Sequence, residues 1–330
     1  MDIALATTLA YATPLLAVVA LMLLVPANLA PQSRLAGSVT LLGGLLLCAA
    51  LMLLTARSGI LTNFTQADGA ITTLMLVVCG LAIAPLADRA RPASLMLVAP
   101  IAAYATLSAL FTFNASSAVV LVGSVLAISI TALVGSATLP AHPARYTVSG
   151  QLRSVSTSQA ALLCGWTLLA ASLVALTMML GTTPDFTLLA LSAIIAALAT
   201  LLTTHANDGL AKAGESFAAV ALITCCTPLT MPLAVMLGLA ASFTVHRSEA
   251  ISLSLRVDDP QHITGALLMP AALGLILPGA LNTTRLASQM SWLGIAIITG
   301  LALSALLWPI VMLLTGLALP KRRVTQGVRA

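Results

Sequence analysis

The amino-acid sequence predicts an all-α, polytopic integral membrane protein with about ten transmembrane helices, eleven being the alternative. Hydrophobic residues make up 60% of the 330 residues and charged residues only 7%, whereas soluble domains carry about 25% charged residues. The apolar runs are continuous, as in Val119–Leu133 and Leu188–Leu202, while the strands of a membrane barrel alternate apolar and polar residues. These runs approach the roughly 20 residues that a helix needs to cross the bilayer.

The predicted spans follow one another through short connections that hold nearly all the charged residues. The N-terminus lacks a basic region and a clear cleavage site, so we expect a retained first helix rather than a signal peptide. One transmembrane domain is expected over residues 1–318, followed by a basic tail at 319–330. The expected spans are 3–26, 35–56, 70–86, 94–113, 118–139, 160–180, 187–204, 217–245, 264–281 and 290–318.

The distribution of Lys and Arg predicts the orientation, because basic residues in short loops stay on the cytoplasmic side. Loops after the odd-numbered spans of the first half hold six basic residues, and the remaining loops of that half hold only Arg57. The N-terminus should therefore face away from the cytoplasm, and the expected location is a bacterial inner membrane. The six residues are Arg34, Arg89, Arg91, Arg145, Arg153 and Lys212.

The second half of the chain disagrees with this orientation if it holds only simple spans, because most of its basic residues would then lie outside. One extra crossing between residues 205 and 246 would remove the conflict. The segment 217–245 is long and is interrupted by Thr227-Pro228 and Met231-Pro232. It is either a broken helix or a re-entrant pair, and it is short for two full spans.

The middle of the predicted spans holds no acidic residue, no Lys and no Arg. Ionisable residues inside a membrane are costly and usually mark ion or proton routes, so their absence argues against an autonomous proton pump. The four histidines lie in loops or at span ends, and no metal-ligand spacing or phosphate loop is present. We expect no catalytic, cofactor or metal site, and no nucleic-acid partner. The histidines are His142, His205, His246 and His262.

Two places remain as candidate sites. The first is a polar cluster of His205, Asp208, Lys212 and Glu215, whose spacing would make the last three neighbours on one helix. It is either part of an ion path or relay at a broken helix, or a solvated cytoplasmic loop. The second is a helix break at Thr227 and Pro228, since transporters expose backbone groups to substrates at such breaks; proline is also ordinary in membrane helices.

Several short motifs follow one another in the first two thirds of the chain. They are the Phe-to-Asp-Gly stretch Phe64–Gly69, the apolar Asn114–Gly135, the Tyr-x-x-x-Gly-Gln-Leu stretch within Ala144–Leu152, and the Gly-Thr-to-Asp-Phe loop Gly181–Phe186. Their order resembles the antiporter-like membrane subunits of respiratory complex I, the Mrp antiporters, membrane-bound hydrogenases and inorganic-carbon-uptake complexes. The resemblance covers roughly residues 1–215.

The departures from this family concern its charged residues. By the alignment around Gly123, the glutamate of the family's fifth helix is replaced by Val125 or a neighbour, and Lys212 lies in a polar stretch rather than in mid-membrane. The resemblance thus implies a shortened, degenerate member, a membrane subunit that anchors or scaffolds a larger energy-coupling complex. Its expected partners are other membrane subunits of the antiporter-like kind, or redox or soluble subunits, within the lipid bilayer.

Two other functions remain open. One is a stand-alone transporter of a small solute or ion that uses the broken helices. The other is a membrane enzyme such as a lipid-linked transferase, for which the only candidate groups are the stretch His246–Glu249 and the pair Asp258 and Asp259.

Overall fold

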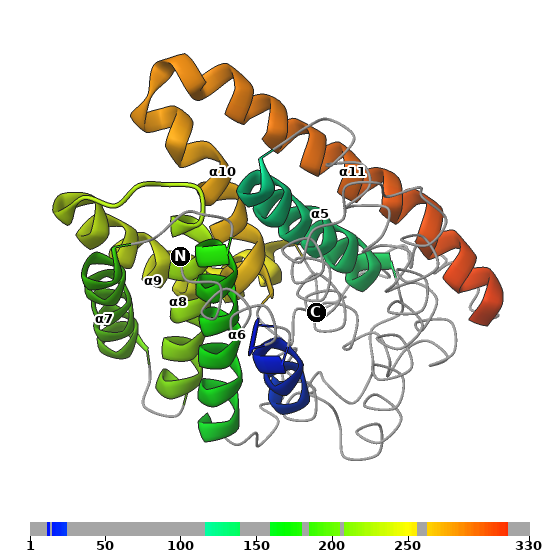
Figure 1. The fold of residues 1–330 in the computed structure, drawn as a ribbon. Helices are drawn as coiled ribbons and strands as arrows, with labels where there is room; N and C mark the ends of the chain where they lie inside the picture. Colours follow the sequence, from blue (N-terminus) through cyan, green and yellow to red (C-terminus); the bar gives the residue numbers. More distant parts are fainter. Residues whose placement is uncertain are drawn as a thin grey trace, which may run out of the picture.

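The computed structural model describes residues 12–13, 15–24, 116–138, 159–179, 185–204, 208–255 and 263–315. The elements of the described part are all helices (Figure 1). After the short apolar helix Leu15–Leu24, its elements are α5 (Ser117–Thr138), α6 (Gln159–Met179), α7 (Phe186–Thr203), α8 (Gly209–Thr224), α9 (Met231–Leu255), the π-helix η3 (Thr264–Leu268), α10 (Met269–Leu281) and α11 (Thr283–Thr315).

Five of these helical segments are long and apolar enough to cross a membrane, which confirms the membrane class. The predicted spans 118–139, 160–180, 187–204 and 264–281 agree with α5, α6, α7 and η3–α10 within one residue at each end. The predicted spans 35–56, 70–86 and 94–113 lie outside the described residues, as does half of 3–26, so the count of ten is not confirmed. The five segments are 118–138, 159–178, 186–203, 264–281 and 283–313.

The predicted span 217–245 is the main error in this part of the chain. The structure has two helices there, α8 and α9, separated by the non-helical residues 225–230. Helix α8 starts at Gly209, eight residues before the predicted start, and includes the polar Lys212 and Glu215. Sequence reasoning assigned this stretch to a loop because of its polar residues, whereas packing against neighbouring helices buries nearly all of α8.

The residues around this turn explain why the chain breaks here. Pro228 lies in the non-helical turn, where its missing N–H costs no helical hydrogen bond. Pro232 is the second residue of α9, in the first turn of the helix, where backbone N–H groups lack helical partners in any case. The chain therefore leaves α8 and re-enters a helix with little backbone cost.

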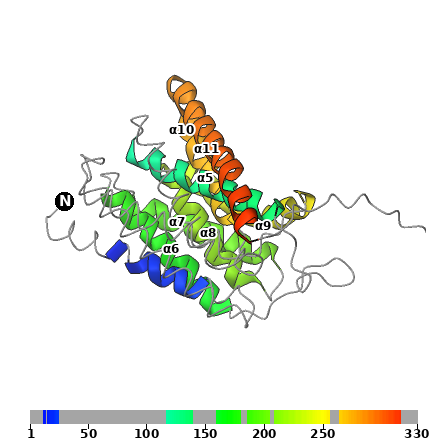
Figure 2. The ribbon, with the colours of Figure 1, turned by 90° about the vertical axis from the view of Figure 1, so that its right-hand side faces the viewer.

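Helix α8 is the central element of the described bundle. It packs against α6, α7, α9, α10 and η3, and in Figure 2 it lies beside α6 and α7. Gly214 lets α6 approach closely, because a Cβ there would lie 3.1 Å from the backbone Cα of Leu163. Such small residues are how membrane helices gain packing contacts.

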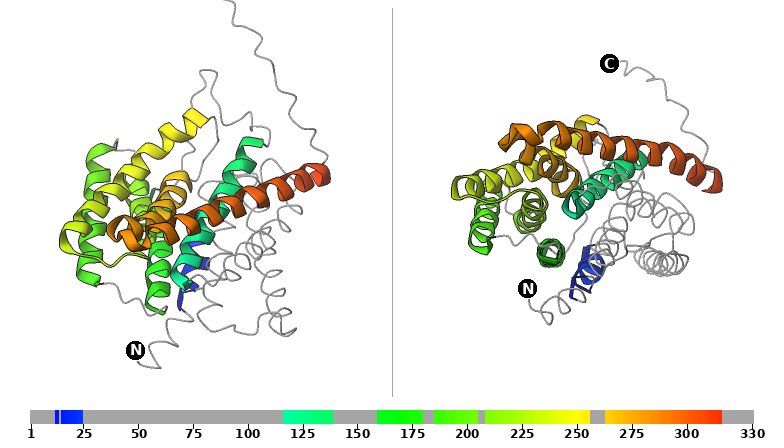
Figure 3. Two further views of the ribbon diagram at one scale, coloured as in Figure 1. Left: turned by 90° about the horizontal axis from the view of Figure 1, so that it is seen from above. Right: turned by 45° about the horizontal axis from the view of Figure 1, so that its top comes forward.

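Helix α11 is the longest helix in the described part of the chain and packs against α5 and α10 (Figure 3). Two close approaches fix it to α5. Thr131 donates from Oγ1 to the carbonyl of Gly300 at 3.2 Å, and a Cβ at Gly300 would meet the carbonyl oxygen of Ala127 at 2.7 Å. The large apolar side chains on its other face are exposed, including Ile298, which suits contact with lipid.

Candidate functional site

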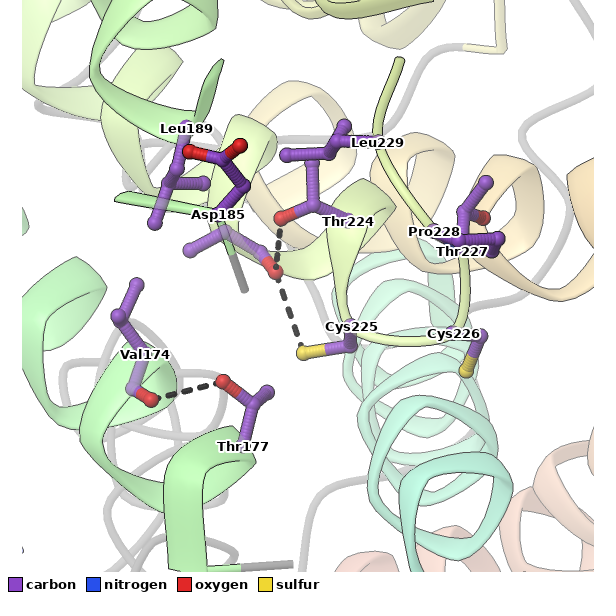
Figure 4. A pocket seen from close by; sticks show the side chains of 11 residues that line it. Val174, Thr177, Asp185, Leu189, Thr224, Cys225, Cys226, Thr227, Pro228 and Leu229 are labelled. Atoms are coloured by element: carbon purple, nitrogen blue, oxygen red, sulfur yellow. Dashed lines mark hydrogen bonds between the residues drawn. The ribbon is translucent and has the colours of Figure 1, made fainter. Parts of the chain in front are cut away.

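A pocket of about 380 Å³ lies where α6 ends, α7 begins and α8 passes into the turn that leads to α9 (Figure 4). Because α6, α7 and α8 run in alternating directions, these ends meet at one end of the bundle. The lining residues are Val174, Thr177, Asp185, Leu189, Ala221, Thr224, Cys225, Cys226, Thr227, Pro228 and Leu229.

Asp185 is placed in the pocket by its role as the N-cap of α7. Its backbone is extended (φ −66°, ψ 104°), and its Oδ1 accepts hydrogen bonds from the backbone N–H groups of Thr187 at 2.9 Å and Leu188 at 3.3 Å. Aspartate is among the preferred residues for this position. Both bonds use the same oxygen, so the cap fixes the carboxylate in place while Oδ2 remains for another donor.

The hydroxyl and thiol groups of the pocket donate to carbonyls of their own chain segment. Thr177 donates to the carbonyl of Val174 at 2.7 Å, Thr224 to that of Val220 at 2.8 Å, and Cys225 to that of Ala221 at 3.1 Å. Thr227 makes a longer contact, 3.5 Å, with the carbonyl of Ile223. The hydrogens of these side chains are therefore directed at backbone carbonyls of their own helices.

The two cysteines of the pocket do not form a metal site with their neighbours. Their sulfur atoms point in different directions (Figure 4), and within the described part of the chain no three His, Cys, Asp or Glu side chains are grouped closely enough to hold a metal ion.

The predicted polar cluster lies at the opposite end of α8. Asp208 precedes the helix and is exposed, whereas Lys212 and Glu215 on the helix are buried, with 9% and 3% of their surface exposed. His205 lies outside the described residues. Lys212 and Glu215 are thus inside a packed helix and not in a solvated loop. Burying ionisable groups in this way is expensive, and in membrane proteins it often marks function.

Gln159, the first residue of α6, fixes the start of α8. Its Oε1 accepts from the backbone N–H of Ala211 at 3.1 Å, and its Nε2 lies 3.4 Å from Oδ1 of Asp208. The side chain thereby satisfies one of the N–H groups that every helix leaves without a partner at its N-terminus. It ties the beginning of α8 to the beginning of α6, at the end of the bundle that holds Lys212.

The structure therefore brings together only some of the predicted site residues. Thr227 and Pro228 line the pocket beyond the C-terminal end of α8, while Asp208 and Lys212 lie at the N-terminal end of this 16-residue helix and Glu215 lies near its middle. The helix is about 24 Å long at 1.5 Å per residue. Sequence reasoning missed Asp185 and Thr177 as pocket residues. An aspartate directly before an apolar run signals a helix N-cap, but only the fold shows that this cap lies beside the end of α8.

No family model and no curated protein matches the chain. Solved structures do match. A Sensor Amt Protein has 15% identity and a TM-score of 0.62, covering 96% of this chain and 94% of its own. Mep2 from Saccharomyces cerevisiae has 14% identity and a TM-score of 0.57, covering 95% and 85%. Mep2 from Candida albicans has 15% identity and a TM-score of 0.56, covering 95% and 84%.

These likenesses show that the chain has the fold of the Amt and Mep proteins, and they correct two expectations. The resemblance to antiporter-like subunits of complex I, Mrp and hydrogenase complexes was wrong. Its motifs were short, and an apolar sequence built mainly from a few residue types matches such motifs easily by chance. The anchoring or scaffolding subunit that this resemblance implied was also wrong.

Proposed function

We propose that this chain is a stand-alone membrane transporter for a small solute, with ammonium as the first substrate to test. The observation that carries the proposal is the likeness of fold over 96% of the chain to a Sensor Amt Protein, and over 95% to the Mep2 proteins. The Amt and Mep proteins are ammonium transporters.

The pocket between α6, α7 and α8 supports this function. Its lining contains the Asp185 carboxylate and no Lys, Arg or His. Two helices, α6 and α8, end at it, and the C-terminal end of a helix carries a partial negative charge. Such surroundings attract a small cation.

The presence of two helices, α8 and α9, where one span was predicted supplies the extra crossing that gives the second half of the chain a consistent orientation. If every described helix from α5 onward crosses the membrane, nine of the ten Lys and Arg residues after residue 139 fall on one side and Arg285 alone falls on the other. We assign the side with nine to the cytoplasm. The pocket then faces outward and the basic tail faces inward. With the four spans predicted before α5, the N-terminus also faces outward. The nine residues are Arg145, Arg153, Lys212, Arg247, Arg256, Lys321, Arg322, Arg323 and Arg329.

The test is flux through the purified chain alone, reconstituted into liposomes that enclose a pH-sensitive dye. An inward ammonium gradient should change the internal pH faster than in liposomes without protein. Circular dichroism of the same preparation, with a strong helical signal, confirms that the chain is folded. A folded chain with no flux of ammonium or other small cations would refute the proposal.

A second candidate function is sensing, in which a solute binds but does not cross. It is favoured by the likeness to a Sensor Amt Protein. Solute binding to the folded chain without flux would select sensing over transport.

A further inference from the structure

We propose that α7 and α9 move together as one rigid pair, which pivots at its inner end and thereby widens or narrows the pocket at its outer end. The inference concerns a motion of the protein itself and does not depend on which solute the chain transports or senses. It rests on how the core is divided, how α7 and α9 are joined, where the pair is anchored and where the pocket lies.

The buried apolar side chains of the described residues form two separate clusters. The larger cluster joins the first helix, α5, α6, α8, η3, α10 and α11, and among the described residues it includes none from α7 or α9. The smaller cluster joins α7 and α9 to one face of α8, which supplies Ala219, Val220 and Ile223, and Leu273 and Leu277 of α10 border it. Because α7 and α9 share a core of their own, a shift of the pair leaves the larger cluster intact.

Helix α7 is also held loosely by its surroundings in the described part of the chain. Only 22% of its span is buried, against 78% of the α5 span. It packs mainly against α8 and α9 (Figure 1). Low local burial is the structural property that permits local motion, so this side of the bundle is where movement is expected.

Two close contacts join α7 to α9. The carbonyl oxygen of Ser192 on α7 lies so near Gly238 on α9 that a Cβ there would be only 2.5 Å away. Thr200 on α7 and Ser242 on α9 are joined by a buried hydrogen bond of 3.0 Å. Close backbone approach at a glycine and interhelical hydrogen bonds are the two main ways in which membrane helices associate. The two helices are therefore expected to keep their mutual arrangement when they move.

The inner part of α9 is anchored at the π-helix η3. A Cβ at Gly265 of η3 would lie 2.6 Å from Cβ of Ser248 and 3.0 Å from the carbonyl oxygen of Thr244, both on α9. Since η3 also packs against α5, α8 and α10, it connects α9 to the main bundle. Single π-helical turns occur frequently at functional sites, and hinges lie at the ends of elements. We therefore place the pivot at this contact.

The pocket lies at the opposite end, on the boundary between the two clusters. Val174 and Ala221 line it from the side of the larger cluster, and Leu189 and Leu229 line it from the side of the smaller one. A tilt of about 10° at the pivot would move the outer end of α9, roughly 15 residues and about 22 Å away, by about 4 Å. A shift of this size changes the width of the pocket.

The test measures distances between pairs of spin labels by double electron–electron resonance, on the purified full chain in nanodiscs and in a cysteine-free background. All labelled positions are exposed. Ala171→Cys on α6 with Ala190→Cys on α7 spans the outer end. Ala160→Cys on α6 with Leu202→Cys on α7 spans the inner end. Ala190→Cys with Met236→Cys on α9 lies within the moving pair.

The outer labels should show two distances, or a distribution about 4 Å wider than that of the labels within the pair. The labels within the pair should show one narrow distance, and the inner labels, near the pivot, should resemble them. A single narrow distance for the outer labels would overturn the inference. A distribution within the pair as wide as that of the outer labels would also overturn it, because α7 and α9 would then move separately.

Variants test the pivot and the contact between the helices. Gly265→Ala places a methyl group against Ser248 and should widen the inner distribution, whereas Gly294→Ala, with nothing within 4 Å, should leave it unchanged. Thr200→Val removes the interhelical hydrogen bond at nearly constant volume and should widen the distribution within the pair. Thr203→Val, which removes an exposed hydroxyl bonded to its own helix, is the matched control.

An inner distribution that folded Gly265→Ala leaves unchanged would contradict the pivot, and equal effects of the two threonine substitutions would contradict the rigid pair. Circular dichroism shows whether each variant is folded, and the labelled chain without these variants decides the inference if one is not. The distances do not involve flux. A rigid outer end would therefore refute this inference and leave the proposed function standing, and a moving pair without ammonium flux would do the reverse.

Discussion

The indole ring of Trp308 on α11 lies directly against Gly135 of α5. A Cβ at Gly135 would come within 2.1 Å of the ring atom Cζ2, so no larger residue fits without moving the ring. The indole Nε1–H of Trp308 donates to the backbone carbonyl of Thr131 at 2.8 Å, one turn earlier on α5. Glycine, indole and carbonyl together fix the position of α11 along α5.

Replacing Gly135 with Ala should therefore destabilise the protein by about 1–3 kcal/mol, because overpacking forces the ring or the helix to shift. Trp308→Leu should relieve the clash, so that the double variant is less destabilised than the sum of the two single variants. Thermal unfolding in detergent measures all three. Additive losses would show that the two residues do not share this contact.

A second prediction concerns the contact between α6 and α8. At Gly214 a Cβ would lie 3.1 Å from both the Cα of Leu163 and the Cβ of Trp166, whereas at Gly294 on α11 nothing lies within 4 Å. Gly214→Ala should cost about 1–3 kcal/mol by overpacking. Gly294→Ala is the matched control and should stabilise by about 0.5 kcal/mol, since glycine weakens a helix interior. Equal effects of the two substitutions on the unfolding temperature would count against the packing described here.

The buried Lys212 and Glu215 give a third prediction. They lie one turn apart on α8, and removing one charge should leave the other buried with less compensation. Lys212→Met and Glu215→Gln should each destabilise by about 3–5 kcal/mol, and the double variant by less than either single variant. A double-mutant cycle on unfolding in detergent measures the coupling. Zero coupling would mean that each charge is stabilised independently of the other.

The assigned orientation gives a fourth prediction. In a cysteine-free background, Thr284→Cys, in the exposed turn that begins α11, should react with a membrane-impermeant maleimide from outside intact cells. Arg329→Cys in the basic tail should react only after the cells are permeabilised. The opposite labelling pattern would reverse the orientation and place the pocket on the cytoplasmic side.

The sequence predicted the fold class well because continuous apolar runs have few structural solutions in a membrane. It located α5, α6 and α7 closely for the same reason. The prediction failed at α8, because the polar Lys212 and Glu215 indicated a loop. Their burial depends on the surrounding helices, which the local sequence does not show. Local composition does not reveal such tertiary burial.

The candidate site was predictable only in part. The break at Thr227-Pro228 was visible from the prolines, and the structure places both residues in the pocket lining. Their neighbour Asp185 is more than 35 residues away along the chain, so no local pattern connects it to the break. The predicted function was wrong because it rested on the order of short motifs along the sequence. The arrangement of the helices in space instead resembles that of the Amt and Mep proteins.

The most direct test of the account is the initial rate of internal pH change after an ammonium gradient is applied to liposomes that contain only this chain. The account predicts a rate that rises in proportion to the amount of folded protein per liposome and that exceeds the rate in protein-free liposomes at every protein density. A rate that stays at the protein-free value while circular dichroism shows an intact helical fold would contradict transport by this chain.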